Sequence, residues 1–475
     1  MHDVNADFSS DLHDMRRTAR LVQLGNAVAR DPTRPFPQVL NEAELAAMYR
    51  LMNSDAVDEA DIAAAHRDET PRRSRALQTV LVLHDTTQMS FQIQGDIPMR
   101  THLERVGPRT QGFRVHASLA VSAEPTHEPL GVVCWQPFVG SKRIQQEDEA
   151  FWNERGGLFA NEGFRWQQGV ALANARLEGV EAVHIADREA DRYDLLEWMI
   201  REGVRFVFRQ CHDRKLADES VFRDRLDEAK EITCLTSVRL SRRLGFKHNG
   251  RQRANLPREQ RDVDLRVTAA RLEIKRGLDP PRSSDRAVWR GVAASAFVNF
   301  VRIKEVDPAE DDDAIDWVLM TTEPIETAED VLRIVDFYRA RWQIEEFFKA
   351  IKTGCSFEKR QSESAGALLN VLALTLPIAW QLLWIRHQAS HAPERRAEDL
   401  FEPDAIALLR HLTPRHDWGD DPPTVTDVYW AIARIGGHTR RNTHPGWLVL
   451  GRGFEDFWKY LEGARAMAAL IGQKM

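Results

Sequence analysis

The segment from Tyr338 to Lys352 carries polar side chains at a spacing that could do chemistry. At about 100° per residue along a helix, a hydroxyl, a guanidinium, a carboxylate and two ammonium groups share one face, from Tyr338, Arg341, Glu345, Lys349 and Lys352. The carboxylate could hold a divalent cation, and the cationic groups beside it could hold phosphate. The alternative is a solvated face with the ion pairs Arg341–Glu345 and Glu345–Lys349.

This helix is predicted to begin at Thr327, because Thr327 and Asp330 have the spacing of a capping box. Neither Gly nor Pro interrupts the chain from there to about Lys352. The opposite side is predicted to be buried and consists of Phe337, Ala340, Ile344, Phe347 and Ile351.

Two more acids stand where apolar runs end. Asp85 follows the run that begins at Thr79, and Asp187 follows the run that begins at Val180. Continuous apolar runs of this length are typical of buried strands, so each carboxylate is predicted at the end of a strand. Glu189 and Asp191 are rival candidates to Asp187, but they lie beyond the strand, in the following turn or helix.

The remaining patterns predict an α/β protein with three parts. Residues 1–76 are predicted to be helical, and Glu162 to Leu177 form a further helix. Further strands are predicted at residues 90–94, 116–121, 130–139 and 204–209, and shorter β-like runs at 232–240, 264–274 and 296–303. The shorter runs suggest an antiparallel insertion at about 212–320 within a domain of residues 77–360, followed by a helical region at 361–475. The apolar stretch 365–385 is long enough to span a membrane, but its polar residues and its proline favour a buried helix.

Composition limits the class of protein. A hydrophobic content of 43% and a charged content of 29% are those of an ordinary soluble protein. The N-terminus is acidic and polar, unlike a signal peptide, and the four dispersed cysteines suggest a reducing compartment without a zinc site. The net charge of −7 is unevenly spread, because residues 239–276 hold three times as many Arg and Lys as Asp and Glu, whereas Glu310–Asp313 is wholly acidic. A basic channel is therefore possible in an acidic protein.

The motif Tyr338-x-x-Arg341-x-x-x-Glu345-x-x-x-x-x-x-Lys352 resembles that of the bacterial cut-and-paste transposases of the insertion-sequence-four family. HDTTQMSF around Asp85 and IADREADRYDLL around Asp187 resemble the segments that hold the two catalytic aspartates of that family. WVLMTTEPIETAEDVLR resembles the segment before its motif helix, and MRRTARLVQLGNAVAR resembles its N-terminal DNA-binding region. The resemblance covers most of the chain, in the same order.

The resemblance implies a ribonuclease-H-like catalytic core with an antiparallel β insertion, flanked by helical N- and C-terminal domains. It implies that Asp85, Asp187 and Glu345 are catalytic and hold two Mg²⁺ ions, for which Mn²⁺ could substitute. The implied DNA contacts are Arg16, Arg17 and Arg20 in the N-terminal domain and Arg209, Trp317, Tyr338, Arg341, Lys349 and Lys352 in the core. Trp317 matches a tryptophan that stacks on a base flipped out of the duplex.

The implied activity is excision through a DNA hairpin, followed by joining of the 3′ ends to target DNA. The implied partners are double-stranded transposon ends, target DNA and a second copy of the chain, which would dimerise through the C-terminal region. The implied location is the bacterial cytoplasm, with the nucleoid. Two alternatives remain open: a catalytically silent DNA-binding protein derived from a transposase, and a general metal-dependent DNA nuclease.

Overall fold

The computed structural model of the chain describes residues 4–93, 100, 102–140, 148–159, 163–229, 232–240, 261–277, 289, 291–308, 314–362, 364–418, 422–439 and 444–472. Internal contacts divide it into two compact units. Unit 1 comprises Met1–Val80, Asp85–Glu181 and Trp342–Met475, and unit 2 comprises Leu81–His84 and Ala182–Arg341. Residues 241–260 of the basic stretch and the acidic run at 310–313 lie outside the described residues.

Unit 1 begins with a series of helices within residues 1–76, the part of the chain that is predicted to be helical. They are α1 (Val4–Phe8), α2 (Met15–Arg30), α3 (Phe36–Val39), α4 (Glu42–Met52), α5 (Glu59–Ile62) and α6 (Ala64–Ser74). Helix α2 is capped by the Asp14 carboxylate, which accepts hydrogen bonds from the N–H groups of Arg16 and Arg17. Its inner residues Leu21 and Leu24 are fully buried, so α2 turns one side toward the core and leaves its arginine-bearing side more accessible.

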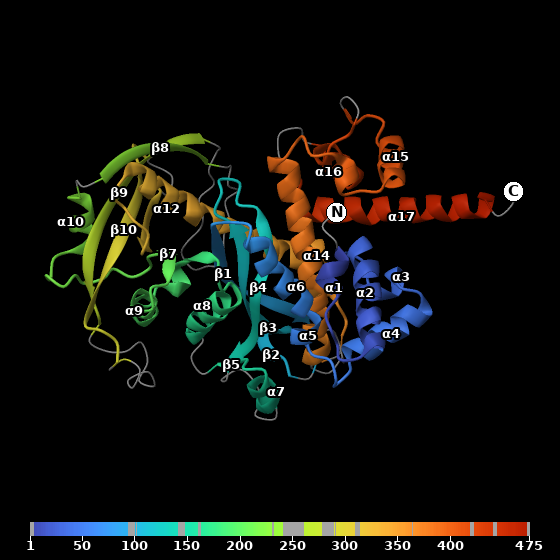
Figure 1. Ribbon diagram of the computed structural model, residues 1–475, viewed down its shortest axis with the longest axis horizontal. Helices are drawn as coiled ribbons and strands as arrows, with labels where there is room; N and C mark the ends of the chain where they lie inside the picture. The colour runs from blue at the N-terminus through green and yellow to red at the C-terminus, as the bar shows by residue number, and fades with distance from the viewer. Residues whose placement is uncertain are drawn as a thin grey trace. The chain divides into compact units, whose positions relative to one another are not determined.

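The strands of unit 1 form a sheet in the order β5-β4-β3-β1, with β2 paired to β3. They are β1 (Thr79–Gln92), β2 (Glu104–Gly107), β3 (Thr110–Ser122), β4 (Pro129–Gly140) and β5 (Leu158–Phe159), and the short α7 (Glu149–Glu154) precedes β5. Nearly every residue of β3 and β4 is buried. The reason is that α8 (Phe164–Arg176) covers one face, while α6 and α14 (Ala365–His391) cover the other (Figure 1).

Strand β1 corrects one prediction. A strand ending at Asp85 and a second strand at 90–94 are predicted, but β1 runs without interruption from Thr79 to Gln92. The β-branched residues Thr86 and Thr87 favour the extended chain, and no Gly or Pro occurs within the strand. What changes at Asp85 is the burial, because residues 80–84 are buried whereas residues 85–87 are half-buried. Asp85 therefore lies in mid-strand, where β1 becomes accessible.

The strands of unit 2 follow the order β1-β6-β7-β11-β10-β9-β8, in which β1 contributes residues 81–84. They are β6 (Glu181–Ala186), β7 (Arg205–Arg209), β8 (Ile232–Leu240), β9 (Arg261–Lys275), β10 (Ser295–Glu305) and β11 (Asp316–Thr321). β6 and β7 are parallel. The four following pairs in this order, β7–β11, β11–β10, β10–β9 and β9–β8, are antiparallel. The predicted antiparallel strands between Asp187 and Glu345 are therefore present.

The helical elements of unit 2 are η2 (Arg188–Ala190), α9 (Tyr193–Arg201), α10 (Phe222–Asp227) and α12 (Ala328–Ala340). Helix α12 lies along strands β8 to β10 (Figure 1). The predicted capping box at its start is confirmed, since the Asp330 N–H donates to Thr327 Oγ1 and the Thr327 N–H donates to Asp330 Oδ2, both at 3.1 Å.

The prediction of one helix from Thr327 to Lys352 is wrong. α12 ends at Ala340, unit 1 resumes with α13 (Trp342–Lys349), and the π-helical turn η4 (Ala350–Gly354) follows. Arg341 keeps helical dihedral angles, but its N–H donates to the carbonyl of Tyr338, three residues back. A bond of that span is a 3₁₀ bond, which tightens the chain locally. The five residues predicted to form the buried face are all buried.

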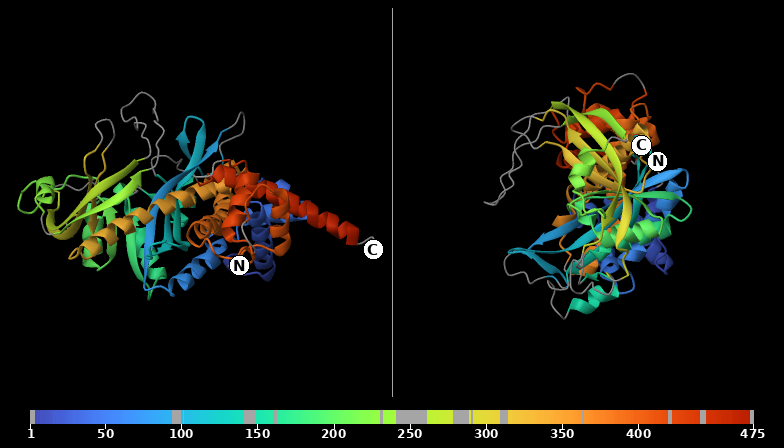
Figure 2. Two further views of the ribbon diagram at one scale, coloured as in Figure 1. Left: turned by 90° about the horizontal axis from the view of Figure 1, so that it is seen from above. Right: turned by 90° about the vertical axis from the view of Figure 1, so that its left-hand side faces the viewer.

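The C-terminal part of unit 1 contains η5 (Phe357–Lys359), α14, η6 (Ala397–Asp399), α15 (Pro403–Leu412), α16 (Val425–Ile435) and α17 (Trp447–Gly472). In the described chain, α14 is the one helix long and apolar enough to cross a membrane, but 83% of its most apolar window is buried. The prediction of a buried helix is confirmed. Helix α17 is buried at Phe457 and Leu461, whereas residues 462–471 are exposed and project from the rest of unit 1 (Figure 2).

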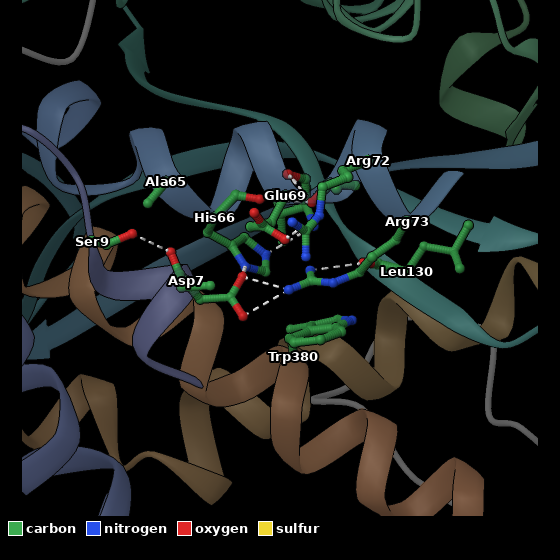
Figure 3. A network of polar contacts seen from close by, with 12 residues as sticks. Asp7, Ser9, Ala65, His66, Glu69, Arg72, Arg73, Leu130 and Trp380 are labelled. Atoms are coloured by element: carbon green, nitrogen blue, oxygen red, sulfur yellow. Dashed lines mark hydrogen bonds and ion pairs between the residues drawn. The ribbon is translucent and has the colours of Figure 1, made fainter. Parts of the chain in front are cut away.

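A buried polar network fixes the N-terminal segment to the core of unit 1 (Figure 3). Its members are Asp7, His66, Arg73 and Trp380, which we name the Asp7 network. Arg73 donates to both Asp7 oxygens, at 2.8 and 2.7 Å, and its guanidinium lies 4.0 Å from the Trp380 ring centre. His66 Nε2 accepts from the Val132 N–H, so the hydrogen is on Nδ1 and is donated to Asp7 Oδ1 at 2.7 Å.

Candidate active site

The first candidate acid, Asp85, has its orientation set by the neighbouring peptide. Its Oδ1 accepts a hydrogen bond from the Thr86 N–H at 2.7 Å. The carboxylate is half-buried, in contrast to the fully buried Leu83 and His84 just before it. Asp85 thus offers hard oxygen ligands at the accessible part of a rigid strand.

The second candidate acid, Asp187, directly follows β6, as predicted. It is half-buried, and its Oδ1 accepts a hydrogen bond from the Glu189 N–H at 2.9 Å, so it caps the single turn η2. The rival Glu189 is exposed. The rival Asp191 is 3% exposed, forms an ion pair with Arg214, and accepts hydrogen bonds from the N–H groups after β7. Asp191 is therefore a structural residue, and Asp187 is the better candidate ligand.

Strand pairing in unit 2 brings Asp187 beside a group of cations and rings. Because Ala186 pairs with Phe208, the next residues along the two parallel strands are Asp187 and Arg209. The Arg209 guanidinium lies 5.1 Å from the centre of the half-buried Trp317 ring, which in turn meets Tyr338 edge-on at 6.0 Å. We name Asp187, Arg209, Trp317 and Tyr338 the Asp187 cluster. The sequence predicted each member separately, and the structure places all four together.

Burial and charge set the titration of this cluster. Burial lowers the pKa of Arg209, and the nearby Arg188 and Arg341 act in the same direction. Burial also raises the pKa of Tyr338, although Arg341 and a hydrogen bond from Arg209 oppose that rise. Tyr338 is 6% exposed, so its hydroxyl stays protonated and can donate to an anion. Arg188 and Arg341 therefore lie within electrostatic reach of Arg209, and Asp187 lies within electrostatic reach of the Tyr338 phenol.

Glu345 and the two candidate lysines lie in unit 1. Glu345 is half-buried on α13. Lys349 is exposed and pairs with Glu346 at 2.7 Å, whereas the alternative of a solvated face would pair it with Glu345. Lys352 lies in the π-helical turn, and burial lowers its pKa, while the nearby Glu358 opposes that effect. π-Helical turns within helices are frequent at functional sites.

The three N-terminal arginines predicted to contact DNA all lie on α2. Arg16 is exposed, whereas Arg17 and Arg20 are half-buried. The Arg20 guanidinium donates to Gln23 Oε1 at 3.1 Å. The three side chains are reachable from solvent, as a role in binding DNA phosphates requires.

The three candidate acids suit a hard divalent cation by their chemistry. Each provides carboxylate oxygens, which Mg²⁺ and Mn²⁺ prefer, and each is partly accessible. Asp85 and Glu345 belong to unit 1, and Asp187 belongs to unit 2. Across the described ranges, no three His, Cys, Asp or Glu side chains are gathered closely enough to hold a metal ion. A metal site shared by these three acids therefore stays a prediction.

Sequence reasoning missed several polar residues near the candidates. In unit 2, a pocket of about 350 Å³ next to Arg209 is also lined by Arg188, Arg223 and Arg302. In unit 1, Arg165 and His116 lie under Thr86. In the sequence, Arg165 is marked only as a basic residue beside a tryptophan in the first turn of α8. No sequence pattern predicts that its side chain contacts β1.

Comparison with known proteins identifies two domains. A family model described as Transposase DNA-binding matches residues 7–57, which include Arg16, Arg17 and Arg20. A model described as Transposase DDE domain matches residues 167–376, which include Asp187 and Glu345 but not Asp85. The sites of DNA contact predicted in the core also lie within this second range.

One solved structure similar to the chain is the cryo-EM structure of the piggyBac transposase synaptic complex with hairpin DNA. The sequence identity is 9% and the TM-score is 0.30. The match covers 66% of this chain and 48% of that one, so the chain spans about half the length of that protein. A likeness this distant shows nothing about how the chain acts.

Proposed function

We propose that this chain, a DDE transposase by its DNA-binding and DDE domains, binds the two ends of a transposable element, excises the element and joins its 3′ ends to target DNA. Within the DDE transposases we place it in the insertion-sequence-four family, closest to the transposon-five transposase, on the motifs around Asp85, Asp187 and Tyr338. The observation that carries the proposal is the Asp187 cluster inside the matched DDE domain, where a carboxylate stands among groups that bind phosphate and stack on bases.

We assign Asp85, Asp187 and Glu345 as the ligands of two Mg²⁺ ions in a ribonuclease-H-like core. When bound, such ions would activate the attacking hydroxyl and neutralise charge at the leaving oxygen. The chain supplies the ligand geometry: Asp85 is held by the Thr86 N–H, and Asp187 by the Glu189 N–H. Both bonds orient a carboxylate without removing it from solvent.

Arg209 of the Asp187 cluster and the nearby Arg341 hold and orient the DNA backbone. Arg209 and Arg341 are planar donors suited to phosphate oxygens, and the Tyr338 hydroxyl adds a neutral donor. Lys349 and Lys352 extend this set on α13 and η4. Such contacts fix the position of the scissile phosphate but do not read the base sequence.

Trp317 is the group that we assign to a base leaving the duplex. Its ring is half-buried and is supported by Tyr338 from the edge and by Arg209 from above. Stacking offsets part of the cost of unstacking a base. In the proposed pathway, water attacks the transposon end, the freed 3′-hydroxyl attacks the opposite strand to form a hairpin, a second water opens it, and the 3′-hydroxyl attacks target DNA.

End recognition and assembly are assigned to the two helical parts. Arg16, Arg17 and Arg20 on α2 would contact the end sequence. The exposed last turns of α17 carry Met467, Leu470 and Ile471, each more than half exposed. Apolar groups on a projecting helix suit pairing with a second copy, and a homodimer would cut both ends together.

The test is selection of bound DNA ends by the full chain, followed by an excision assay with Mg²⁺. We expect excision and strand-transfer products, and we expect Asp85→Ala and Glu345→Ala to abolish them without loss of end binding. Glu189→Gln, which changes an exposed acid next to Asp187, serves as the matched control and should stay active. Specific binding with no cleavage by the unaltered chain would favour a silent binding protein, and cleavage without strand transfer would favour a nuclease.

A further inference from the structure

A hydrogen-bonded group in unit 1 lies directly beneath Asp85 and has no part in the proposed chemistry. It consists of Thr86 on β1, His116 on β3 and Arg165 on α8, and we name it the Thr86 network. Arg165 Nε donates to Thr86 Oγ1 at 3.0 Å, and Thr86 Oγ1 lies 3.0 Å from His116 Nδ1. His116 is fully buried and Arg165 is 7% exposed. A charged side chain is rarely buried to this degree unless it is paired or hydrogen-bonded, so the bond to Thr86 matters for Arg165.

Helix α8 packs closely against His116, and this packing holds Arg165 near Thr86. The Trp166 ring meets His116 edge-on at 4.7 Å. Gly169, one turn further, lies so close to His116 that an added Cβ would be 2.7 Å from Nε2. Any larger residue at 169 would push α8 away from β3 and draw Arg165 from Thr86.

The Arg165 guanidinium is always a donor, so Thr86 Oγ1 accepts from it. The tautomer of His116 decides whether the Thr86 hydroxyl donates to Nδ1 or accepts from it. Burial, with the Arg165 charge nearby, lowers the pKa of His116 to about 3. The imidazole is therefore neutral at neutral pH, and Arg165 carries the charge of the Thr86 network.

Thr86 connects this chain to the candidate metal ligand, because its own N–H donates to Asp85 Oδ1 at 2.7 Å. We propose that Arg165 and His116 are positioning residues that act through Thr86 to hold the Asp85 carboxylate in the orientation that binds a divalent cation. The inference rests on the proposed function for the role of Asp85. Groups of this kind behind a metal ligand typically change metal affinity or activity about 10- to 100-fold when they are removed.

The test measures Mn²⁺ binding to the full chain by electron paramagnetic resonance, together with the unfolding temperature. Thr86→Val keeps the shape of the side chain and removes the hydroxyl, and Arg165→Met removes the donor. Both are expected to weaken Mn²⁺ binding about 10- to 100-fold. Thr86→Ser keeps the hydroxyl and should restore the affinity. Thr79→Val makes the same change at a half-buried position earlier in β1 and should bind as the unaltered chain does.

Asp85→Ala separates the two hypotheses. If Asp85→Ala weakens Mn²⁺ binding but Thr86→Val and Arg165→Met do not, the positioning role is overturned and the proposed function stands. If Asp85→Ala leaves Mn²⁺ binding unchanged, the metal assignment of Asp85 and the positioning role both fail. A lower unfolding temperature with unchanged Mn²⁺ affinity would show that the Thr86 network serves stability alone, which also overturns the inference.

Discussion

The Asp7 network and the Asp187 cluster contain almost the same chemical groups but differ in exposure and in the charges around them. Each has an aspartate, an arginine that lies over a tryptophan, and a second ring, from His66 or Tyr338. In the first, Asp7 is 1% exposed and receives both Arg73 and His66, so one negative charge meets one positive charge and a neutral imidazole. In the second, Asp187 is half-buried, and three guanidinium groups lie within electrostatic reach of one another.

The difference teaches how to tell a structural polar group from a functional one. A network that is buried and balanced in charge stabilises the fold, and breaking it leaves a buried charge without a partner. A group that is partly accessible and holds more positive than negative charge favours an incoming anion. Composition alone does not distinguish the two, whereas exposure and charge balance do.

The largest expected effect separates the two aspartates. Asp187→Asn should slow DNA cleavage at least about 1,000-fold, since it removes a carboxylate ligand of the proposed divalent cation, and should leave the unfolding free energy almost unchanged. The measurement is single-turnover cleavage with Mg²⁺ next to urea unfolding. A variant that cleaves normally would remove Asp187 from the active site.

Asp7→Asn should do the reverse and cost about 3–5 kcal/mol of unfolding free energy. Burial alone raises the pKa of Asp7, but the hydrogen bond from His66 and the charge of Arg73 outweigh it, so the folded-state pKa is below 3.8. The stabilisation by Asp7 is therefore present above pH 3.8 and is lost as the pH falls through the lower folded-state value. The gap in stability between the variant and the unaltered chain should be full at pH 7 and shrink below about pH 4. Asp11→Asn, at an exposed position, is the control, and a gap independent of pH would contradict the assignment.

The sequence predicts the local parts of both regions better than their assembly. The apolar run before Asp187 and the capping box at Thr327 depend on neighbouring residues, and both are confirmed. The position of Asp187 next to Arg209 depends on strand register, and the ion pair of Asp7 with Arg73 depends on helix packing between distant segments. The predicted end of β1 at Asp85 is wrong because an acid does not by itself end a strand, and Thr86 and Thr87 continue the extended chain.

The helix around Glu345 shows a second limit of local reasoning. Nothing in the residues from Thr327 to Lys352 breaks a helix by propensity, yet the chain tightens at Arg341 and widens at Ala350. The Cys355 N–H donates to the Ala350 carbonyl, five residues back, at 2.7 Å. Such irregularities come from tertiary packing, which single-sequence patterns do not contain.

A smaller effect should separate the two tryptophans. Trp317→Ala should slow hairpin formation about 5- to 150-fold, because the stacking of one base is worth about 1–3 kcal/mol, and should slow first-strand nicking less. Trp380→Phe loses the bond from its indole N–H to the Pro129 carbonyl and should lower the unfolding temperature without changing the ratio of the two steps. The measurement is time-resolved separation of nicked and hairpin products. Equal slowing of both steps by Trp317→Ala would argue against the stacking role.

The smallest expected effect on cleavage concerns Arg209, and the same change at Arg73 tests whether charge or geometry matters more in each region. Arg209→Lys keeps the charge but loses the planar contact with Trp317, which is worth about 1 kcal/mol at a partly exposed site, so cleavage should slow about 5-fold. Arg73→Lys cannot make two bonds to Asp7 and a third to the Leu130 carbonyl and should cost about 1.5–3 kcal/mol of unfolding free energy. The measurements are single-turnover cleavage and urea unfolding of both variants. A residue that serves only to bind DNA should not change the unfolding free energy of the free protein. If Arg209→Lys lowered the unfolding free energy as much as Arg73→Lys does, the Asp187 cluster would therefore be a second structural network.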